Sequence, residues 1–249
     1  MTPHCRYVLR LADTNLVLAQ RLGEWVGHAP ALEEDLGLAN VSLDLMGQAR
    51  LLLSHAGLLE GRGRGEDELA FLREESEYLN LTLAEQPNGD FGDTIVRQFL
   101  FDAWQLGLYE CLTRSKDAAL AAIAGKGIRE ATYHLRYSRG WLIRLGDGTP
   151  ESHARVEGSL ARIWPFTNEL FDDDEVDRAI AAAGLGPLPS SLKNAWTSRV
   201  AEALASATLA QPAPSAFGWY GKQGRHSEHL GYLLAEMQSL HRAHPGATW

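Results

Sequence analysis

Apolar residues recur at intervals of three and four positions along almost the whole chain, and this periodicity restricts the fold more than any other feature. Such spacing places apolar side chains on one face of an α-helix. The alternating pattern of a β-strand does not persist beyond a few residues. We therefore expect an all-α protein.

Turn-forming residues divide the periodic segments into two long helical hairpins. The first hairpin is expected over about residues 5–27 and 31–58, and the second over about 91–113 and 117–145. Two helix pairs of this length, joined by a longer crossover, are the plan of a ferritin-like four-helix bundle.

Shorter elements are expected outside the hairpins. The acidic segment 65–86 is expected to form one partly exposed helix. A helix from Thr149 to Phe171 should bend at Pro165. Three more helices are expected, at 174–183, 192–209 and 226–242, with a loop rich in proline, glycine and aromatic residues before the last.

The chain of 249 residues is 45% hydrophobic, which is enough to bury one large core. We expect a single ferritin-like domain over residues 1–249. Its core bundle would cover about 5–145, with additional helices and a C-terminal segment at about 150–249.

Charge and cysteine content exclude several classes of function. A net charge of -9 leaves no basic face for nucleic acid. No apolar run is long enough to span a membrane, and the N-terminus lacks a signal-peptide pattern. Cys5 and Cys111 suggest no disulfide framework and are expected to be buried small hydrophobes. We expect a cytoplasmic protein.

Polar residues interrupt the apolar faces of several helices, and buried groups of this kind need partners. They are Asn40, Asp44, Gln48, Asp102, Glu130 and His134. The two aspartates are expected to form ion pairs with neighbours such as Arg50 or Arg97. A further pair, Glu24 and His28, is expected only to cap the first helix.

A di-iron bundle site needs one Glu from each of two helices and a Glu-x-x-His from each of the other two. None of the nine His residues has an acid three positions before it. Glu130 is followed at that spacing by Tyr133, and Asp44 by Gly47. His134, one turn after Glu130, offers a single imidazole.

These positions therefore suggest a degenerate di-iron site that serves as a polar core. We expect this chain to bind no metal or cofactor and to have no catalytic residue. The degenerate positions are Asp44, Gly47, Gln48, Asp102, Glu130, Tyr133 and His134. Nucleophile and phosphate-loop motifs such as Gly-x-Ser-x-Gly are also missing from the sequence.

The C-terminal segment combines aromatic and charged residues, a mixture common at protein interfaces. The candidate interface residues are Trp219, Tyr220, Lys222, Arg225, His226, Glu228 and His229. Plain packing is the alternative. Lys222 and Arg225 could also meet a phosphate, whereas His226 and His229 could hold a metal only weakly without a third ligand.

Long strings spread over the chain resemble one known family. They are LADTNLVLAQRLGEWVGHAPALEEDLGLAN, LDLMGQAR, EQPNGDFGDTIVRQ, FDAW, EATYHLRYSRGW, RLGDGT, HSEHLGYLLAEMQ and the terminal PGATW. With them the chain resembles the structural, non-catalytic subunits of bacterial phenylacetyl-CoA 1,2-epoxidases, which are multicomponent oxygenases of aromatic degradation. Residues 60–70 and 172–195 match this family less distinctively.

The resemblance implies a ferritin-like fold and a stable complex with a homologous catalytic subunit, which carries the di-iron centre and binds phenylacetyl-CoA. It also implies a reductase with flavin and an iron-sulfur cluster, and small subunits that this chain meets indirectly. In such structural subunits the iron ligands are lost, in agreement with Gly47 after Asp44 and Tyr133 after Glu130.

Two other functions are open on sequence grounds. The chain could be a di-metal oxygenase or oxidase in its own right, using Asp44, Asp102, Glu130 and His134 with unusual geometry. It could also be a ferritin-like storage protein, although the ferroxidase ligands are missing. Periodicity does not identify which exposed apolar residues would contact a partner.

Overall fold

The computed structural model describes residues 1–247 and divides into two compact units, each described here by itself. The first unit combines Met1–Glu85 with the segment that begins at Tyr220, and the second spans Gln86–Trp219. Within residues 1–247 the only β-type pairing is an isolated bridge between Tyr220 and Arg225, so the all-α prediction is confirmed. The expectation of one domain stays a prediction. Thr248 and Trp249, the end of the PGATW string, lie outside the described residues.

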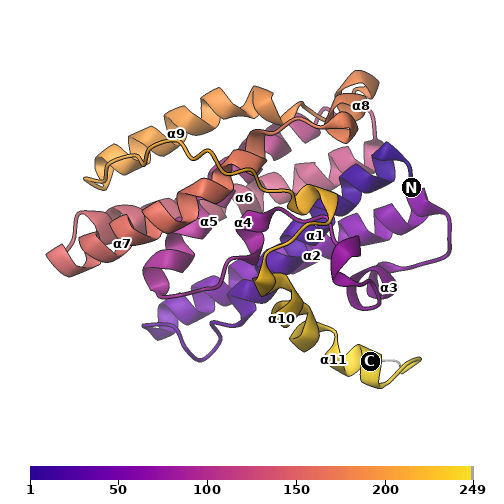
Figure 1. The fold of residues 1–249 in the computed structure, drawn as a ribbon, viewed down its shortest axis with the longest axis horizontal. Helices are drawn as coiled ribbons and strands as arrows, with labels where there is room; N and C mark the ends of the chain where they lie inside the picture. Colours follow the sequence, from indigo (N-terminus) through magenta and orange to yellow (C-terminus); the bar gives the residue numbers. More distant parts are fainter. Residues whose placement is uncertain (248–249) are drawn as a thin grey trace. The chain divides into compact units, whose positions relative to one another are not determined.

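The first unit is built on the hairpin of α1 (Pro3–Gly23) and α2 (Leu32–Glu60), which lie side by side in Figure 1. Thr2 caps α1, because its Oγ1 accepts a hydrogen bond from the Cys5 amide at 3.2 Å. The helix ends at Gly23, four residues before the expected end. The capping role expected for His28 is therefore wrong: His28 lies beyond the helix, with Nδ1 3.1 Å from the Val26 carbonyl oxygen.

The segment expected as one acidic helix over residues 65–86 is broken into short pieces. It contains α3 (Glu66–Phe71), a 3₁₀ turn (Glu75–Glu77) and α4 (Thr82–Glu85). The second half is buried rather than exposed. Long-range partners override the local helical preference here, because the buried side chains of Arg73 and Glu85 bind groups of α1 and of the C-terminal segment.

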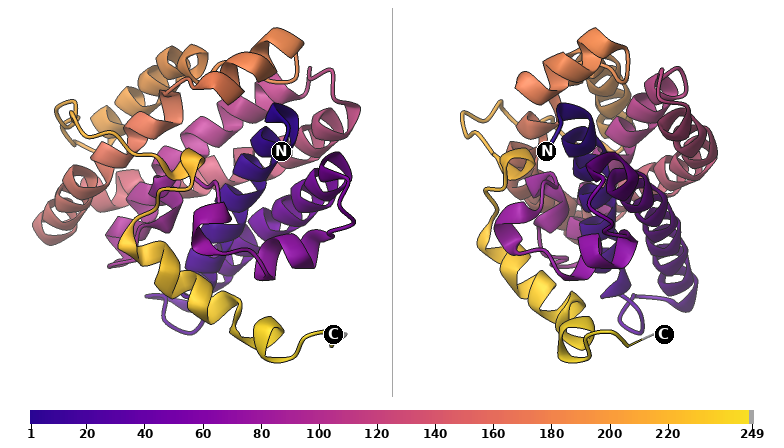
Figure 2. Two further views of the ribbon diagram at one scale, coloured as in Figure 1. Left: turned by 45° about the vertical axis from the view of Figure 1, so that its right-hand side comes forward. Right: turned by 90° about the vertical axis from the view of Figure 1, so that its right-hand side faces the viewer.

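The C-terminal segment carries α10 (Glu228–Met237) and α11 (Ser239–Ala243) where one helix over 226–242 was expected. The helix breaks at Gln238, whose buried side chain donates from Nε2 to the carbonyl oxygens of Ala70 and Arg73 at 3.2 and 3.0 Å. Figure 2 shows this segment, in yellow, running beside the purple segment that contains α3 and α4. The end of the chain thus holds the irregular segment in place.

The second unit is built on the hairpin of α5 (Phe91–Leu112) and α6 (Ala118–Gly146), close to the expected bounds. Asp90 and Asp93 form a reciprocal capping box at the start of α5, with distances of 3.0 and 3.2 Å. Almost every side chain of α5 is buried, because α6, α7 and α9 pack against it. This hairpin prediction is confirmed.

The remaining elements of the second unit are α7 (Pro150–Ile163), a 3₁₀ helix (Trp164–Phe171), α8 (Glu175–Ala183), a 3₁₀ turn (Pro189–Leu192) and α9 (Lys193–Ser206). The change from α to 3₁₀ geometry occurs one residue before Pro165, as proline requires at a helix boundary. The expected loop follows α9. No helix within residues 1–247 has the length and apolar character needed to cross a membrane.

Candidate functional site

The polar core of the second unit is centred on Asp102, whose side chain is fully buried on α5. Its Oδ1 accepts a hydrogen bond from Gln98 Nε2 at 2.6 Å, and its Oδ2 accepts one from Ser138 Oγ at 2.7 Å. Burial raises the pKa of Asp102 to about 6, and the charge of His134 and these two hydrogen bonds limit the rise. The expected ion pair with Arg97 is wrong, because Arg97 donates instead to the Gln86 carbonyl and to Asn88 Oδ1.

Three predicted positions on α6 differ in how they face the core. His134 is fully buried, and Glu130 is half-buried. Tyr133 is 40% exposed and its ring lies 5.4 Å from the Arg136 guanidinium. Tyr133, which occupies the position where a di-iron site would have a second histidine, therefore points outward.

The predicted polar residues of α2 also differ in how deeply they are buried. Gln48 is buried and accepts a hydrogen bond at Oε1 from Asn15 Nδ2 at 3.2 Å. Asp44 is half-buried, while Asn40 is exposed, so its expected burial is wrong. Gly47 is partly exposed, and a side chain there would meet no atom within 4 Å.

The expected ion pair between Asp44 and Arg50 is also wrong. Arg50 instead bonds Glu66 Oε1 through Nε at 2.8 Å and Nη2 at 2.6 Å. The charged partner of this exposed guanidinium lies at the start of α3 and not on its own helix. Sequence spacing along one helix does not reveal such a neighbour.

The donor set does not fit a carboxylate-bridged di-iron centre, which takes four carboxylates and two imidazoles from a bundle. The degenerate positions supply three carboxylates, Asp44, Asp102 and Glu130, and one imidazole, His134. Both oxygens of Asp102 are already bonded by uncharged donors. This arrangement can satisfy buried polar groups and fix helix register.

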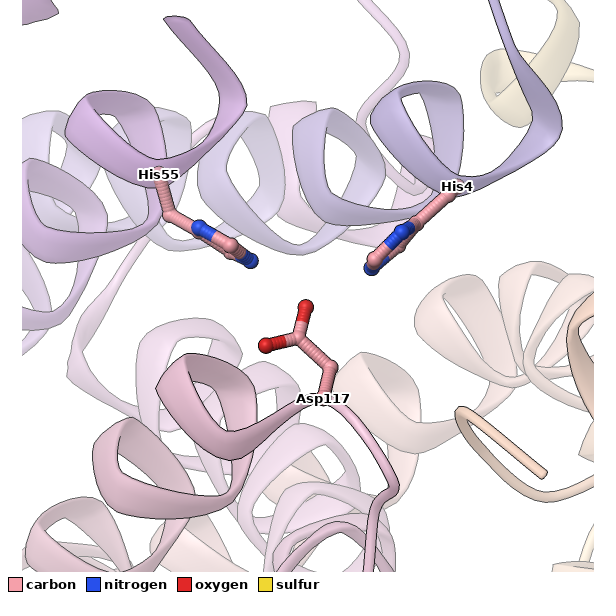
Figure 3. A group of neighbouring side chains, drawn as sticks. All are labelled: His4, His55 and Asp117. Atoms are coloured by element: carbon pink, nitrogen blue, oxygen red, sulfur yellow. The ribbon is translucent and has the colours of Figure 1, made fainter. Parts of the chain in front are cut away.

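Two other imidazoles approach each other in the first unit. Figure 3 shows His4 of α1 and His55 of α2, whose ring centroids are 6.0 Å apart in an edge-on arrangement. Asp117, labelled in the same figure, belongs to the second unit, where its Oδ1 accepts from the amides of Ala119 and Leu120 and so caps α6. Two imidazoles alone hold a metal only weakly.

His226, one of the candidate interface residues, has a buried side chain that attaches the C-terminal segment to the rest of the first unit. Its Nδ1 lies 2.6 Å from Glu85 Oε1 and its Nε2 lies 2.9 Å from the Tyr78 carbonyl oxygen. Both neighbours are acceptors, so both ring nitrogens must carry a proton and the imidazole is cationic. Burial opposes this charge, but the Glu85 carboxylate and the Tyr78 carbonyl outweigh it and raise the pKa of His226.

Glu85 is the common acceptor at this point and is itself fully buried. Oε2 accepts from the amide and the hydroxyl of Ser227, both at 2.7 Å, and Oε1 accepts from Asn80 Nδ2 at 2.9 Å. The Glu85 carbonyl oxygen accepts two bonds from Arg21. The carboxylate therefore fixes the residues that precede α10.

The other C-terminal candidates are less enclosed. Lys222 and His229 each offer a carbonyl oxygen to an arginine of α1, to Arg10 at 3.1 Å and to Arg21 at 3.2 Å. Tyr220 is exposed, with the Arg225 guanidinium 5.8 Å from its ring centroid, and Glu228 is exposed at the start of α10.

Trp219 belongs to the second unit, and its side chain packs against residues of that unit. Its ring stacks on Phe166 with centroids 4.4 Å apart, and its Nε1 donates to the Pro165 carbonyl oxygen at 3.1 Å. Trp219 therefore has partners of its own within the second unit, and the other six candidates belong to the first unit. Their role as an interface stays a prediction.

Sequence reasoning missed a buried ion pair in the first unit. Arg73 bonds both carboxylate oxygens of Asp13, and the amide of Leu79 donates to Asp13 Oδ2 at 2.9 Å. The Arg73 guanidinium also lies 4.3 Å from the centroid of the Tyr78 ring. The apolar residues concentrated between 78 and 84, within a segment expected to be partly exposed, were the available signal of burial.

Comparison with known proteins places the chain among relatives along its full length. The model of a family described as phenylacetic acid catabolic protein matches residues 1–249. The chain is 53% identical over 243 residues to the C-type subunit of the 1,2-phenylacetyl-CoA epoxidase of Escherichia coli (strain K12), with 98% of each protein covered. The resemblance inferred from the sequence strings is thereby confirmed.

One solved structure supports the fold. It is protein 19 with aldehyde deformylating oxidase activity from Synechococcus, at a TM-score of 0.55, with 96% of this chain and 95% of that chain covered. The sequence identity is 15%, so the likeness concerns the fold alone. The predicted ferritin-like bundle with additional C-terminal helices is confirmed.

Proposed function

The chain belongs to the phenylacetic acid catabolic protein family, and from this premise we propose that it is the structural subunit of a phenylacetyl-CoA epoxidase. In this role it scaffolds a homologous di-iron catalytic subunit and does no chemistry of its own. The relative in Escherichia coli is named as one subunit of such an epoxidase, and the high identity supports the same place for this chain.

The observation that carries the proposal is the bonding of Asp102. Both of its oxygens accept hydrogen bonds from neutral donors, Gln98 and Ser138, so the buried carboxylate is already bonded within the protein. A site that bound iron would need these oxygens for the metal. The absence of a ligand atom at Gly47 and the outward direction of Tyr133 point the same way.

In the proposed assembly this chain holds no cofactor. The di-iron centre belongs to the catalytic partner, flavin and an iron-sulfur cluster belong to the reductase, and the reductase and small subunits are met indirectly. The proposed location is the cytoplasm.

The test is co-expression of this chain with the homologous di-iron subunit, followed by size-exclusion chromatography in mild salt. We expect one co-eluting complex with iron confined to the partner. Separate elution of two folded proteins would contradict the scaffold role. Close to two equivalents of iron in this chain alone, lost in Glu130→Ala, would instead support an independent di-metal enzyme.

A further inference from the structure

Helix α2 is apolar on two opposite faces. One face, which includes Leu38, Leu45 and Leu52, is buried, and α2 packs on α1. The other face carries leucines that are 42% to 82% exposed, namely Leu32, Leu36, Leu43, Leu51 and Leu58. A long exposed apolar face of this kind marks an interaction site, so a partner is expected to cover it.

The exposed leucines form a regular line, here called the α2 stripe. Its eight positions are 32, 36, 40, 43, 47, 51, 54 and 58, with steps of four, four and three residues that repeat along the helix. The three other members, Asn40, Gly47 and Ser54, are small or neutral. The stripe therefore has no charged residue over about 39 Å of helix surface.

The size of the α2 stripe matches a protein interface. Its five leucines expose on the order of 600 Å², which is as large as the largest apolar patches on monomeric proteins. One side of a standard interface buries about 800 Å², so these leucines supply most of that area.

The shape of the stripe indicates what covers it. A straight line at helical spacing fits another helix of similar length, because steps of four, four and three residues keep the contact line nearly parallel to the helix axis. Gly47, at the middle of the line, has open space around it and permits close approach of a second backbone.

A lipid surface is a poorer occupant. Interfacial helices carry Lys or Arg beside their apolar face. The first turn of α2 carries Glu33, Glu34 and Asp35 instead, and the exposed Arg50 of this helix is neutralised by its ion pair with Glu66. This charge would repel anionic headgroups and favours a protein partner with basic residues opposite that turn.

A hollow lies at the far end of the stripe. It has a volume of about 530 Å³ and is lined by Ser54, Gly57, Leu58, Gly61, Gly63, Arg64 and Gly65. Interfaces often seat one large apolar anchor in such a hollow. The hollow and the stripe together form one continuous surface, because Ser54 and Leu58 belong to both.

We propose that the α2 stripe is the surface on which this chain binds its partner, and that the occupant is a long apolar helix of the homologous di-iron subunit. The inference rests on the proposed function and adds the residues that perform it. The partner's helix lies along α2 and places a large apolar side chain in the hollow beside Leu58.

The test measures binding of the full-length chain to the tagged di-iron homologue. The Leu43→Arg, Leu58→Arg double variant should bind at least 100-fold more weakly than the wild type. Tyr232→Arg is the matched control, because Tyr232 is 76% exposed on α10, away from the stripe, and it should bind within threefold of the wild type. Equal binding by the double variant and the wild type would overturn the inference.

A second measurement does not depend on weakened binding. A photo-crosslinking residue at position 51 should capture the di-iron homologue, whereas one at position 232 should not. Capture at 232 alone would overturn the inference. If the chain alone forms a dimer in light scattering and Leu43→Arg makes it monomeric, the stripe joins two copies, and the proposed occupant is wrong.

The two hypotheses fail differently. If the wild type does not bind the homologue at all, the proposed function fails together with its surface. If the wild type binds and the stripe variant binds equally well, only the surface is wrong. Unchanged thermal unfolding of the double variant is expected, because both leucines are exposed, and it excludes misfolding as the cause of lost binding.

Discussion

His226 and Glu85, separated by 141 positions in the chain, meet as a buried ion pair with Nδ1 2.6 Å from Oε1. The second ring nitrogen of His226 faces the Tyr78 carbonyl oxygen, so the pair requires the imidazolium form. The attachment of the C-terminal segment is therefore linked to the protonation of one histidine.

The His226→Gln variant should lose about 3 kcal/mol of unfolding free energy at pH 6, because it leaves the Glu85 carboxylate without its buried cation. The folded-state pKa of His226 is raised, so its contribution is complete below the unfolded pKa of about 6.5 and is lost as pH rises through the folded value. Urea unfolding of both proteins from pH 6 to 9 should show the difference shrinking. A difference that grows with pH would contradict the assignment.

The Asp102→Asn variant tests the buried carboxylate of the second unit. Asp102 has a folded pKa of about 6 against an ordinary value of 3.8, so folding penalises its ionised form. The penalty is absent below about pH 4, grows as pH rises, and reaches about 3 kcal/mol above pH 6. The unfolding free energy of the variant relative to the wild type should therefore rise between pH 4.5 and 7. Urea titrations that give a constant difference would show that Asp102 does not titrate in this range.

Asp13 and Arg73 are both buried, so Asp13→Ala leaves an uncompensated guanidinium in the core. We expect a loss of about 3–5 kcal/mol of unfolding free energy. Glu202→Ala is the control, since it removes the exposed partner of Arg139 and should cost less than about 1 kcal/mol. Denaturant unfolding of both variants provides the comparison, and equal losses would argue against burial of the Asp13 pair.

Gly221 lies where the chain passes close to another backbone. A Cβ at this position would be 2.2 Å from the Asn80 carbonyl oxygen, so Gly221→Ala should displace the start of the C-terminal segment and destabilise the protein by about 1–3 kcal/mol. Gly125→Ala, in an exposed turn of α6 with no atom within 4 Å, should stabilise it by about 0.5–1 kcal/mol. The midpoint temperature of thermal unfolding should fall for Gly221→Ala and rise for Gly125→Ala. A shift in the same direction for both variants would contradict this geometry.

The sequence by itself determined the helical class and both long hairpins, and its ligand spacing predicts the degenerate set at Asp44, Gly47, Glu130 and Tyr133. Helical periodicity and the spacing of ligand residues are local properties, so they can be read without a structure. Helix capping is also local, so the predicted and observed starts of α5 and α7 agree. In both helices a polar capping residue directly precedes the first helical residue.

Only the tertiary structure decided which polar residues are buried and what they bind. Asn40 follows the apolar pattern but is exposed, whereas Glu85 and Arg73 are buried in a segment that was expected to be a partly exposed helix. Their oppositely charged partners, His226 and Asp13, lie 60 or more positions away, and no local pattern encodes such a pairing.

The exposure of the α2 stripe was likewise invisible in the sequence. The leucines that pack on the protein and those that remain uncovered have the same composition and the same helical spacing. Burial depends on which neighbouring elements cover each face, and that is a property of the folded chain rather than of any single segment.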